Sequence, residues 1–190
     1  MSSYRIWTIS AIERERQHLT KWVRRKLVAA IELGASRLLI HAPVKSGKRL
    51  IVEYLALRDA PVSHQQPSTR IHFFVSAFYR ISDNEQREEL REHGIQVYPV
   101  HNRKCMDTLR ESISKMLQEG KKIVVHLDEC DYGSEESQIL SEFYHFIDVL
   151  PVVVIMYSAT PQEVRVSLSN SGMEDESVSN QFVAENNTVV

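Results

Sequence analysis

A short apolar run leads directly into a Gly-Lys loop in Leu38-Leu39-Ile40-His41-Ala42-Pro43-Val44-Lys45-Ser46-Gly47-Lys48-Arg49. The apolar run is typical of a buried strand, and a helix is expected after the loop. In such a unit the loop offers backbone N–H groups to phosphate, and the helix N-terminus adds the positive end of its dipole. Gly47 allows close approach of the backbone, and Lys48 neutralises phosphate charge. The segment predicts nucleotide binding, with a solvated basic turn as the alternative for a Gly-Lys pair taken alone.

Two later segments also place polar residues at the ends of apolar runs. Asp128-Glu129-Cys130-Asp131 comes after the apolar run 123–125, and Ser158-Ala159-Thr160 comes after the apolar run 152–155. Adjacent carboxylates at the end of a buried strand are costly unless a cation or water compensates them. A helix cap would explain one carboxylate there, but not three in four residues. The three segments can therefore meet around one triphosphate and its magnesium ion.

Apolar runs and helical patterns alternate along the chain. Strands are expected at 37–41, 70–77, 95–100, 122–127 and 151–157, and helices at 10–34, 48–57, 83–94, 104–119 and 134–150. Ser10 and Glu13 match a capping box for the first helix, and Gly34, Gly94 and Gly120 are the expected ends of three helices. Short, continuous apolar strands between helices indicate a sheet covered on both faces. We therefore predict a three-layer α/β fold with a five-stranded, mainly parallel sheet.

The composition is that of one globular domain. Of the 190 residues, 43% are hydrophobic and 25% are charged. We expect the domain to span residues 1–165, and residues 166–190 to form a polar tail or linker because they lack a core-forming pattern. No apolar run reaches the ~20 residues that cross a bilayer, and no signal-peptide pattern opens the chain. With only Cys105 and Cys130 as cysteines, an intracellular, soluble and reduced protein is expected.

The net charge of −2 combines a basic end and an acidic end. Residues 1–60 contain 12 Lys and Arg against 5 Asp and Glu, whereas residues 128–190 contain 1 against 12. The whole chain thus lacks the strong positive charge of a dedicated nucleic-acid binder. Four cations surround Trp22, namely Lys21, Arg24, Arg25 and Lys26. They could grip nucleic acid, but the solvated face of an amphipathic helix is the preferred explanation.

The three segments resemble, in order and spacing, motifs of superfamily 2 helicases and related DNA translocases, in their first RecA-like domain. Motif I of that family, Ala-x-x-x-x-Gly-Lys-Thr, is similar to residues 42–49. Motif II, Asp-Glu-x-Asp, and motif III, Ser-Ala-Thr, are similar to residues 128–131 and 158–160. Pro161, which follows motif III, resembles the pattern of the restriction-translocase branch of the family. Residues 74–77 are at the position of motif Ia. The resemblance covers roughly residues 10–163, and it implies a RecA-like P-loop NTPase fold.

The resemblance also implies ATP and Mg²⁺ as ligands, nucleic acid as a partner, and a role for each motif residue. Lys48 would bind phosphate, Asp128 would hold Mg²⁺ and Glu129 would act as the catalytic base. Gln17 lies where a glutamine often reads adenine, with an ordinary surface glutamine as the favoured alternative. The other implied positions are Ala42, Pro43, Val44, Lys45, Ser46, Gly47 and Arg49 for the nucleotide, and Ser158, Ala159 and Thr160 for coupling to nucleic acid.

Two departures from the family pattern bear on activity. Arg49 replaces the Thr that would hold Mg²⁺, and its guanidinium has no acceptor. It would instead contact a phosphate or pair with Asp128, and Ser46 would offer a hydroxyl. The family also needs a second RecA-like domain, in cis or in trans. The sequence therefore predicts an ATP-binding, helicase-like or translocase-like module with hydrolysis left open. A degenerate, non-hydrolysing scaffold for nucleotide sensing or protein interaction is the alternative, and a small-molecule P-loop kinase is a distant third.

Overall fold

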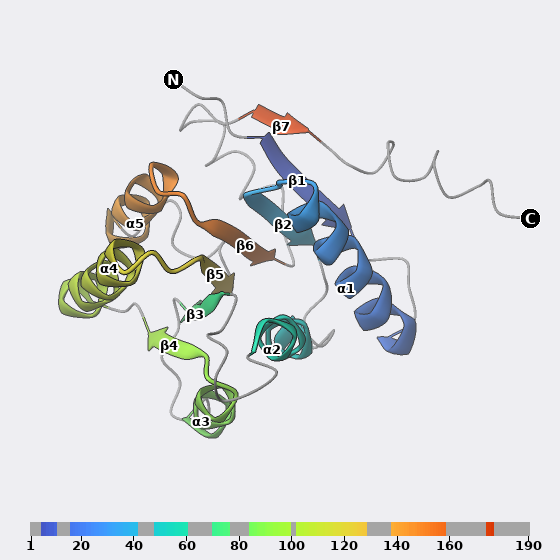
Figure 1. The fold of residues 1–190 in the computed structure, drawn as a ribbon, viewed down its shortest axis with the longest axis horizontal. Helices are drawn as coiled ribbons and strands as arrows, with labels where there is room; N and C mark the ends of the chain where they lie inside the picture. Colours follow the sequence, from blue (N-terminus) through green and yellow to red (C-terminus); the bar gives the residue numbers. More distant parts are fainter. Residues whose placement is uncertain are drawn as a thin grey trace, which may run out of the picture.

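A computed structural model describes residues 5–10, 16–41, 48–60, 70–76, 84–99, 102–128, 138–158 and 174–176. These ranges contain β1 (Arg5–Ser10), α1 (Arg16–Glu32), β2 (Arg37–His41), α2 (Lys48–Asp59), β3 (Ile71–Ser76), α3 (Asn84–Glu92), β4 (Gln96–Pro99), α4 (Arg103–Gln118), β5 (Ile123–Asp128), α5 (Gln138–Asp148), β6 (Val153–Ser158) and β7 (Glu174–Glu176). Strands and helices alternate as expected from β2 to β6, and Figure 1 shows one central sheet with helices on both sides.

The strands form one sheet in the order β4-β3-β5-β6-β2-β1-β7, and every pairing is parallel. All five predicted strands are present, so the α/β fold with a parallel sheet is confirmed. β6 lies between β2 and β5, which brings the strands that precede the three motifs next to one another. The sheet has two strands more than the five predicted, one near each end of the chain.

β1 corrects the prediction for the N-terminal segment. Ser10 is the last residue of this strand and pairs with His41 of β2, so it does not cap a helix. The first helix begins at Arg16 instead of near Ser10. The Ser-x-x-Glu spacing matched a capping box by chance, because the pairing of residues 5–10 with the apolar strand β2 determines the local structure.

β7 lies inside the segment that was expected to be a polar tail. Glu174, Asp175 and Glu176 pair in parallel with Arg5, Ile6 and Trp7 of β1. A short, charged strand at a sheet edge needs only backbone hydrogen bonds, and such edges resist further pairing. The rest of residues 166–190 lies outside the described ranges, so the tail assignment there stays a prediction.

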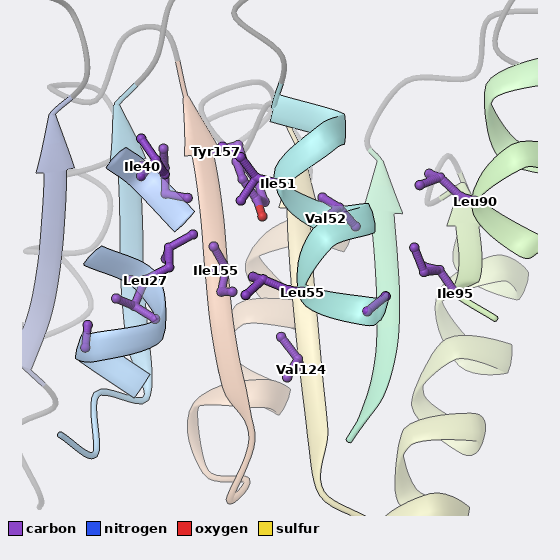
Figure 2. Packing of buried hydrophobic residues seen from close by; sticks show 14 of the residues in the cluster. Leu27, Ile40, Ile51, Val52, Leu55, Leu90, Ile95, Val124, Ile155 and Tyr157 are labelled. Carbon is purple, nitrogen blue, oxygen red and sulfur yellow. The ribbon is translucent and has the colours of Figure 1, made fainter. Parts of the chain in front are cut away.

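Two apolar clusters lie on opposite faces of the sheet, and the alternation of side chains along each strand divides the residues between them. On one face α4 and α5 pack against the sheet, and their core residues are Met106, Leu109, Ile113, Phe143 and Ile147. On the other face α1, α2 and α3 pack, with Val23, Leu27, Ile51, Leu55 and Leu90 in the core. Figure 2 shows Ile51, Val52 and Leu55 of α2 directed at the strands that carry Val124, Ile155 and Tyr157. The three-layer prediction is thereby confirmed.

The helix ends agree with the glycines that the sequence indicated. Gly34, Gly94 and Gly120 each have a positive φ, of 90°, 75° and 73°. After α4, for example, Gly120 N–H donates to Leu117 O and Lys121 N–H donates to Met116 O, which satisfies the last carbonyls of the helix. At the start of α4, the side chain of Asn102 accepts from the backbone N–H of Cys105 at 2.9 Å. These caps set the helix lengths between strands.

Replacing Phe143 by Ala tests the core beneath α5. Phe143 is fully buried, so its removal should lower the free energy of unfolding by about 3–5 kcal/mol through lost burial and a residual cavity. Urea unfolding followed by circular dichroism measures this loss. Val149 follows the same helix and is 76% exposed, so Val149→Ala should change stability by less than about 0.5 kcal/mol. Equal losses in the two variants would contradict this packing.

Candidate functional site

Polar residues end the four neighbouring strands at the carboxyl edge of the sheet. The pairing places Ser76 of β3 opposite Asp128 of β5, and Asp128 opposite Tyr157 of β6. Ser158 of β6 lies opposite His41 of β2. In open parallel sheets ligands bind outside the carboxyl ends of the strands, because loops and helix N-termini meet there. The candidate site therefore lies at the ends of β2, β6 and β5.

Lys48 and Asp128 meet at this edge. Lys48 Nζ lies 3.6 Å from Asp128 Oδ1, with side-chain exposures of 15% and 29%. Lys48 is the first residue of α2, so the positive end of the helix dipole lies beside the pair. Two residues 80 positions apart in the sequence thus form one charged site. The ammonium group and the helix N-terminus suit an anionic group, while the half-buried carboxylate suits a cation.

Arg49 points to different partners from those expected. Its Nε lies 2.9 Å from Glu53 Oε1 on α2, and its Nη1 lies 2.9 Å from Glu89 Oε2 on α3. The alternative in which Arg49 pairs with Asp128 is therefore wrong, because Lys48 occupies that place. The Glu53–Arg49–Glu89 ion triad joins the N-terminal part of α2 to α3. The Arg49 side chain is 38% exposed, so the triad lies at the surface beside the candidate site.

Several predicted site residues lie outside the described ranges. These are the loop residues Ala42, Pro43, Val44, Lys45, Ser46 and Gly47, the predicted base Glu129, and Ala159 and Thr160 of the third motif. Gln17 belongs to α1, and its predicted contact with adenine stays a prediction. Ser158 is described, and its side chain is fully buried at the end of β6. Among the predicted residues the structure thus brings Lys48 and Asp128 into contact, and it places Ser158 beside His41 at the same edge of the sheet.

The carboxylate of Asp128 has the chemistry that a magnesium ion requires. Among the residues that the structure describes, no group of three or more His, Cys, Asp or Glu side chains could hold a metal ion. Magnesium nevertheless binds commonly through one or two carboxylates together with phosphate oxygens and water. Asp128 would be such a ligand, and Lys48 would contact the same phosphates. Arg49, held by two glutamates, would contribute no ligand.

A buried polar chain that the sequence did not reveal crosses the face covered by α2. We give this name to Asp59, His72, His126 and Tyr157, whose exposed fractions are all 6% or less. His72 Nε2 lies 3.1 Å from Asp59 Oδ2, and His72 Nδ1 lies 2.9 Å from His126 Nε2. His126 Nδ1 lies 2.9 Å from the Tyr157 hydroxyl. The available signal was two histidines inside strand segments, at positions where an apolar residue is usual.

The surroundings of the chain shift the pKa values of three members. Burial opposes ionisation of Asp59, but the hydrogen bond and charge of His72 and the contact with Arg70 outweigh it, so the pKa of Asp59 is lowered. Burial, and then the charge of His72, hold the pKa of His126 well below its ordinary value. Burial, and then the charge of Asp128, raise the pKa of Tyr157 well above its ordinary value. Tyr157 thus links the buried polar chain electrostatically to the candidate site.

The cations near the N-terminus contribute to packing as well as to surface charge. Arg24 Nη2 donates to Leu50 O at 3.0 Å, and its guanidinium lies 4.6 Å from the centre of the Tyr54 ring. Arg24 therefore joins α1 to α2, a role that neither sequence explanation foresaw. Arg25 is exposed, as a solvated helix face requires. The side chains of Lys21 and Trp22 lie outside the described part of the chain.

Comparisons with known proteins add little to this geometry. No protein-family profile matches the sequence, and no curated protein matches it. Among solved structures, one similar chain is described as the Hef helicase domain of Pyrococcus furiosus, at 14% sequence identity and a TM-score of 0.34. The similarity covers 94% of this chain and 36% of that chain. A similarity this low indicates no function. In the described residues, no helix is long and apolar enough to cross a membrane.

The lowered pKa of Asp59 predicts a specific dependence of stability on pH. A carboxyl whose pKa is lower in the folded state stabilises fully above its ordinary pKa of 3.8, and this contribution is lost as the pH falls through the lower folded value. Asp59→Asn should therefore be less stable than the wild type at pH 7, and the difference should shrink below about pH 4. Urea unfolding from pH 3 to pH 8 measures it. Both proteins should also lose stability below about pH 6.5, because His126 stays neutral when folded. A difference independent of pH would contradict the ion pairing of Asp59.

Proposed function

We propose that this chain is the ATP-binding module of a helicase-like or translocase-like protein of superfamily 2, which acts on nucleic acid together with a second RecA-like domain. The observation on which the proposal rests is the contact between Lys48 and Asp128 at the carboxyl edge of the sheet. The resemblance assigns these residues to the phosphates and to Mg²⁺. They come from separate motifs, and the fold places them side by side.

The strand order supports the same proposal. β6 separates β2 from β5, so the strand before the third motif lies between the strands that precede the Gly-Lys loop and the acidic motif. Ser158, paired with His41, is the described residue of that motif. Ser158, Ala159 and Thr160 would there sense whether a phosphate lies between Lys48 and Asp128, and Glu129 would orient the attacking water. Nucleic acid would bind across the same edge, near the end of β3.

The position of Arg49 favours a second candidate function. Because Arg49 is held by Glu53 and Glu89, the place of the metal-binding hydroxyl is taken by an ion triad that joins two helices. Such a chain would bind nucleotide through Lys48 and hydrolyse it slowly or not at all. It would then act as a nucleotide-sensing or protein-interaction scaffold. The two functions share the binding step and differ in turnover.

Titration with ATP tests the binding step that both functions need. Isothermal calorimetry should detect ATP binding to the wild type, and Lys48→Ala should weaken the affinity at least about tenfold, because a charge-assisted contact worth roughly 1.5–3 kcal/mol is removed. Lys115→Ala, on the exposed side of α4, is the matched control and should bind as the wild type does. Absence of binding to the wild type in the presence and absence of Mg²⁺ would refute both functions.

Turnover separates the two functions. A helicase-like module should hydrolyse ATP faster when single-stranded DNA or RNA is added, and Glu129→Gln should abolish that activity if Glu129 is the base. If the chain is a scaffold, the wild type should hydrolyse ATP no faster than the Glu129→Gln variant. Arg49→Thr introduces the hydroxyl that motif I has at this position. Mg²⁺-dependent ATP hydrolysis in this variant but not in the wild type would identify the wild type as a degenerate ATPase. Phosphate release measured with and without nucleic acid gives all of these rates.

A further inference from the structure

Helix α2 is attached to the sheet at both of its ends. Lys48 at the start of the helix pairs with Asp128 of β5. Asp59 at its end contacts His72 of β3, and His72 contacts His126, which is also in β5. Arg70 adds a second contact, with its Nη1 at 3.3 Å from Asp59 Oδ1. Both ends of α2 therefore connect to β5. The first turn contacts Asp128 directly, and the last turn reaches His126, two residues earlier, through His72.

The two attachments respond differently to a ligand. A phosphate or metal ion that enters between Lys48 and Asp128 must separate the two charges and replace their contact. The attachment through Asp59 lies about 16 Å away along the helix, at 1.5 Å per residue, and both Asp59 and His72 are buried. It stays intact when the ligand enters. The position of the helix relative to β5 then depends more on its last turn than on its first.

The hydrogen bonds of the buried polar chain constrain one another. The Asp59 carboxylate only accepts, so His72 must donate to it through Nε2. The contact between His72 Nδ1 and His126 Nε2 and the contact between His126 Nδ1 and the Tyr157 hydroxyl each need one donor and one acceptor, so with His126 neutral the direction of the first fixes the direction of the second. Each member satisfies its neighbour, and a buried donor or acceptor left without a partner costs about 1–3 kcal/mol. The chain therefore holds its members, and the elements that contain them, in one arrangement.

We propose that Asp59, His72, His126 and Tyr157 are positioning residues, which keep α2 at a fixed height above β5 and β6 so that Lys48 stays opposite Asp128 when a nucleotide separates their charges. The inference rests on the proposed nucleotide site. Tyr157 completes the arrangement, because it contacts His126 and is paired in the sheet with Asp128. The chain thus runs from the last turn of α2 back to the site at its first turn.

The main experiment removes the distant attachment and measures ATP affinity. Asp59→Ala should weaken ATP binding about five- to tenfold, although Asp59 touches no ligand. Asp59→Asn, whose carbonyl can still accept from His72, should stay within about twofold of the wild type. Val125→Ala is the matched control, because Val125 adjoins His126 in β5 but belongs to the cluster on the opposite face. It should destabilise the protein and leave the affinity within about twofold. Equal affinities in Asp59→Ala and Val125→Ala would overturn the proposal.

A second measurement needs no nucleotide. Hydrogen exchange at the amides of α2 should be faster in Asp59→Ala than in Val125→Ala, compared at equal global stability. If α2 exchanges faster but the wild type binds no ATP, the proposed function fails while the attachment of α2 stands. If the wild type binds ATP and neither exchange nor affinity responds to Asp59→Ala, the positioning proposal fails alone. If Asp59→Ala does not fold, Tyr157→Phe is used in its place, because it removes only a hydroxyl. We expect its ATP affinity to be at least about threefold weaker than that of the wild type, and a smaller loss would contradict the proposal.

Discussion

The candidate site depends on one constraint, the parallel pairing of β3, β5, β6 and β2 in their observed register. Because all four strands run in one direction, the residues that end them lie at one edge of the sheet. Asp128 has Ser76 on one side and Tyr157 on the other, and Ser158 lies beside His41. Backbone hydrogen bonds therefore bring the polar residues together before any side chain contributes. The helices follow from this, since a parallel sheet must be covered on both faces.

Charge is then distributed unevenly around that edge. Lys48 and Asp128 compensate each other at the end of the sheet, while Arg49 is compensated by glutamates of α2 and α3. Consecutive basic residues thus have separate roles, one in the candidate site and one in holding two helices together. A Thr at position 49 would leave Glu53 and Glu89 without this partner. Arg49, where the sequence departs from motif I, therefore belongs to a local network of ion pairs. One role of Arg49 is to hold α3 next to α2.

Much of the fold could be predicted from sequence because its signals are local. Apolar runs identified β2, β3, β5 and β6, and the glycines after three helices marked their ends correctly. β1 was missed because the Ser10–Glu13 spacing satisfies a rule for helix starts, whereas strand pairing is a long-range effect. β7 was missed because an edge strand of acidic residues has no apolar pattern.

The site was harder to predict than the fold. Motif order could suggest that Lys48 meets Asp128, but the partners of Arg49 depend on where α3 lies. The contact between His72 and His126 depends on the register of two strands 54 residues apart. No single-sequence pattern contains that information, since a histidine inside an apolar strand segment does not reveal which residue it contacts. The resemblance guided the choice of site residues, whereas the buried polar chain could be seen only in three dimensions.

The buried polar chain has a consequence for how the sheet reaches a unique pairing. Sliding one strand past its neighbour by two residues keeps every side chain on its original face, so the alternation of apolar residues cannot oppose that error. Depending on its direction, such a shift of β5 would move His126 away from either His72 or Tyr157, and it would leave polar groups without partners among apolar side chains. The apolar residues distinguish one face from the other, and the four polar residues distinguish the native alignment from its two-residue neighbours. In a protein whose site is assembled from strand ends, that discrimination decides whether Asp128 arrives beside Lys48.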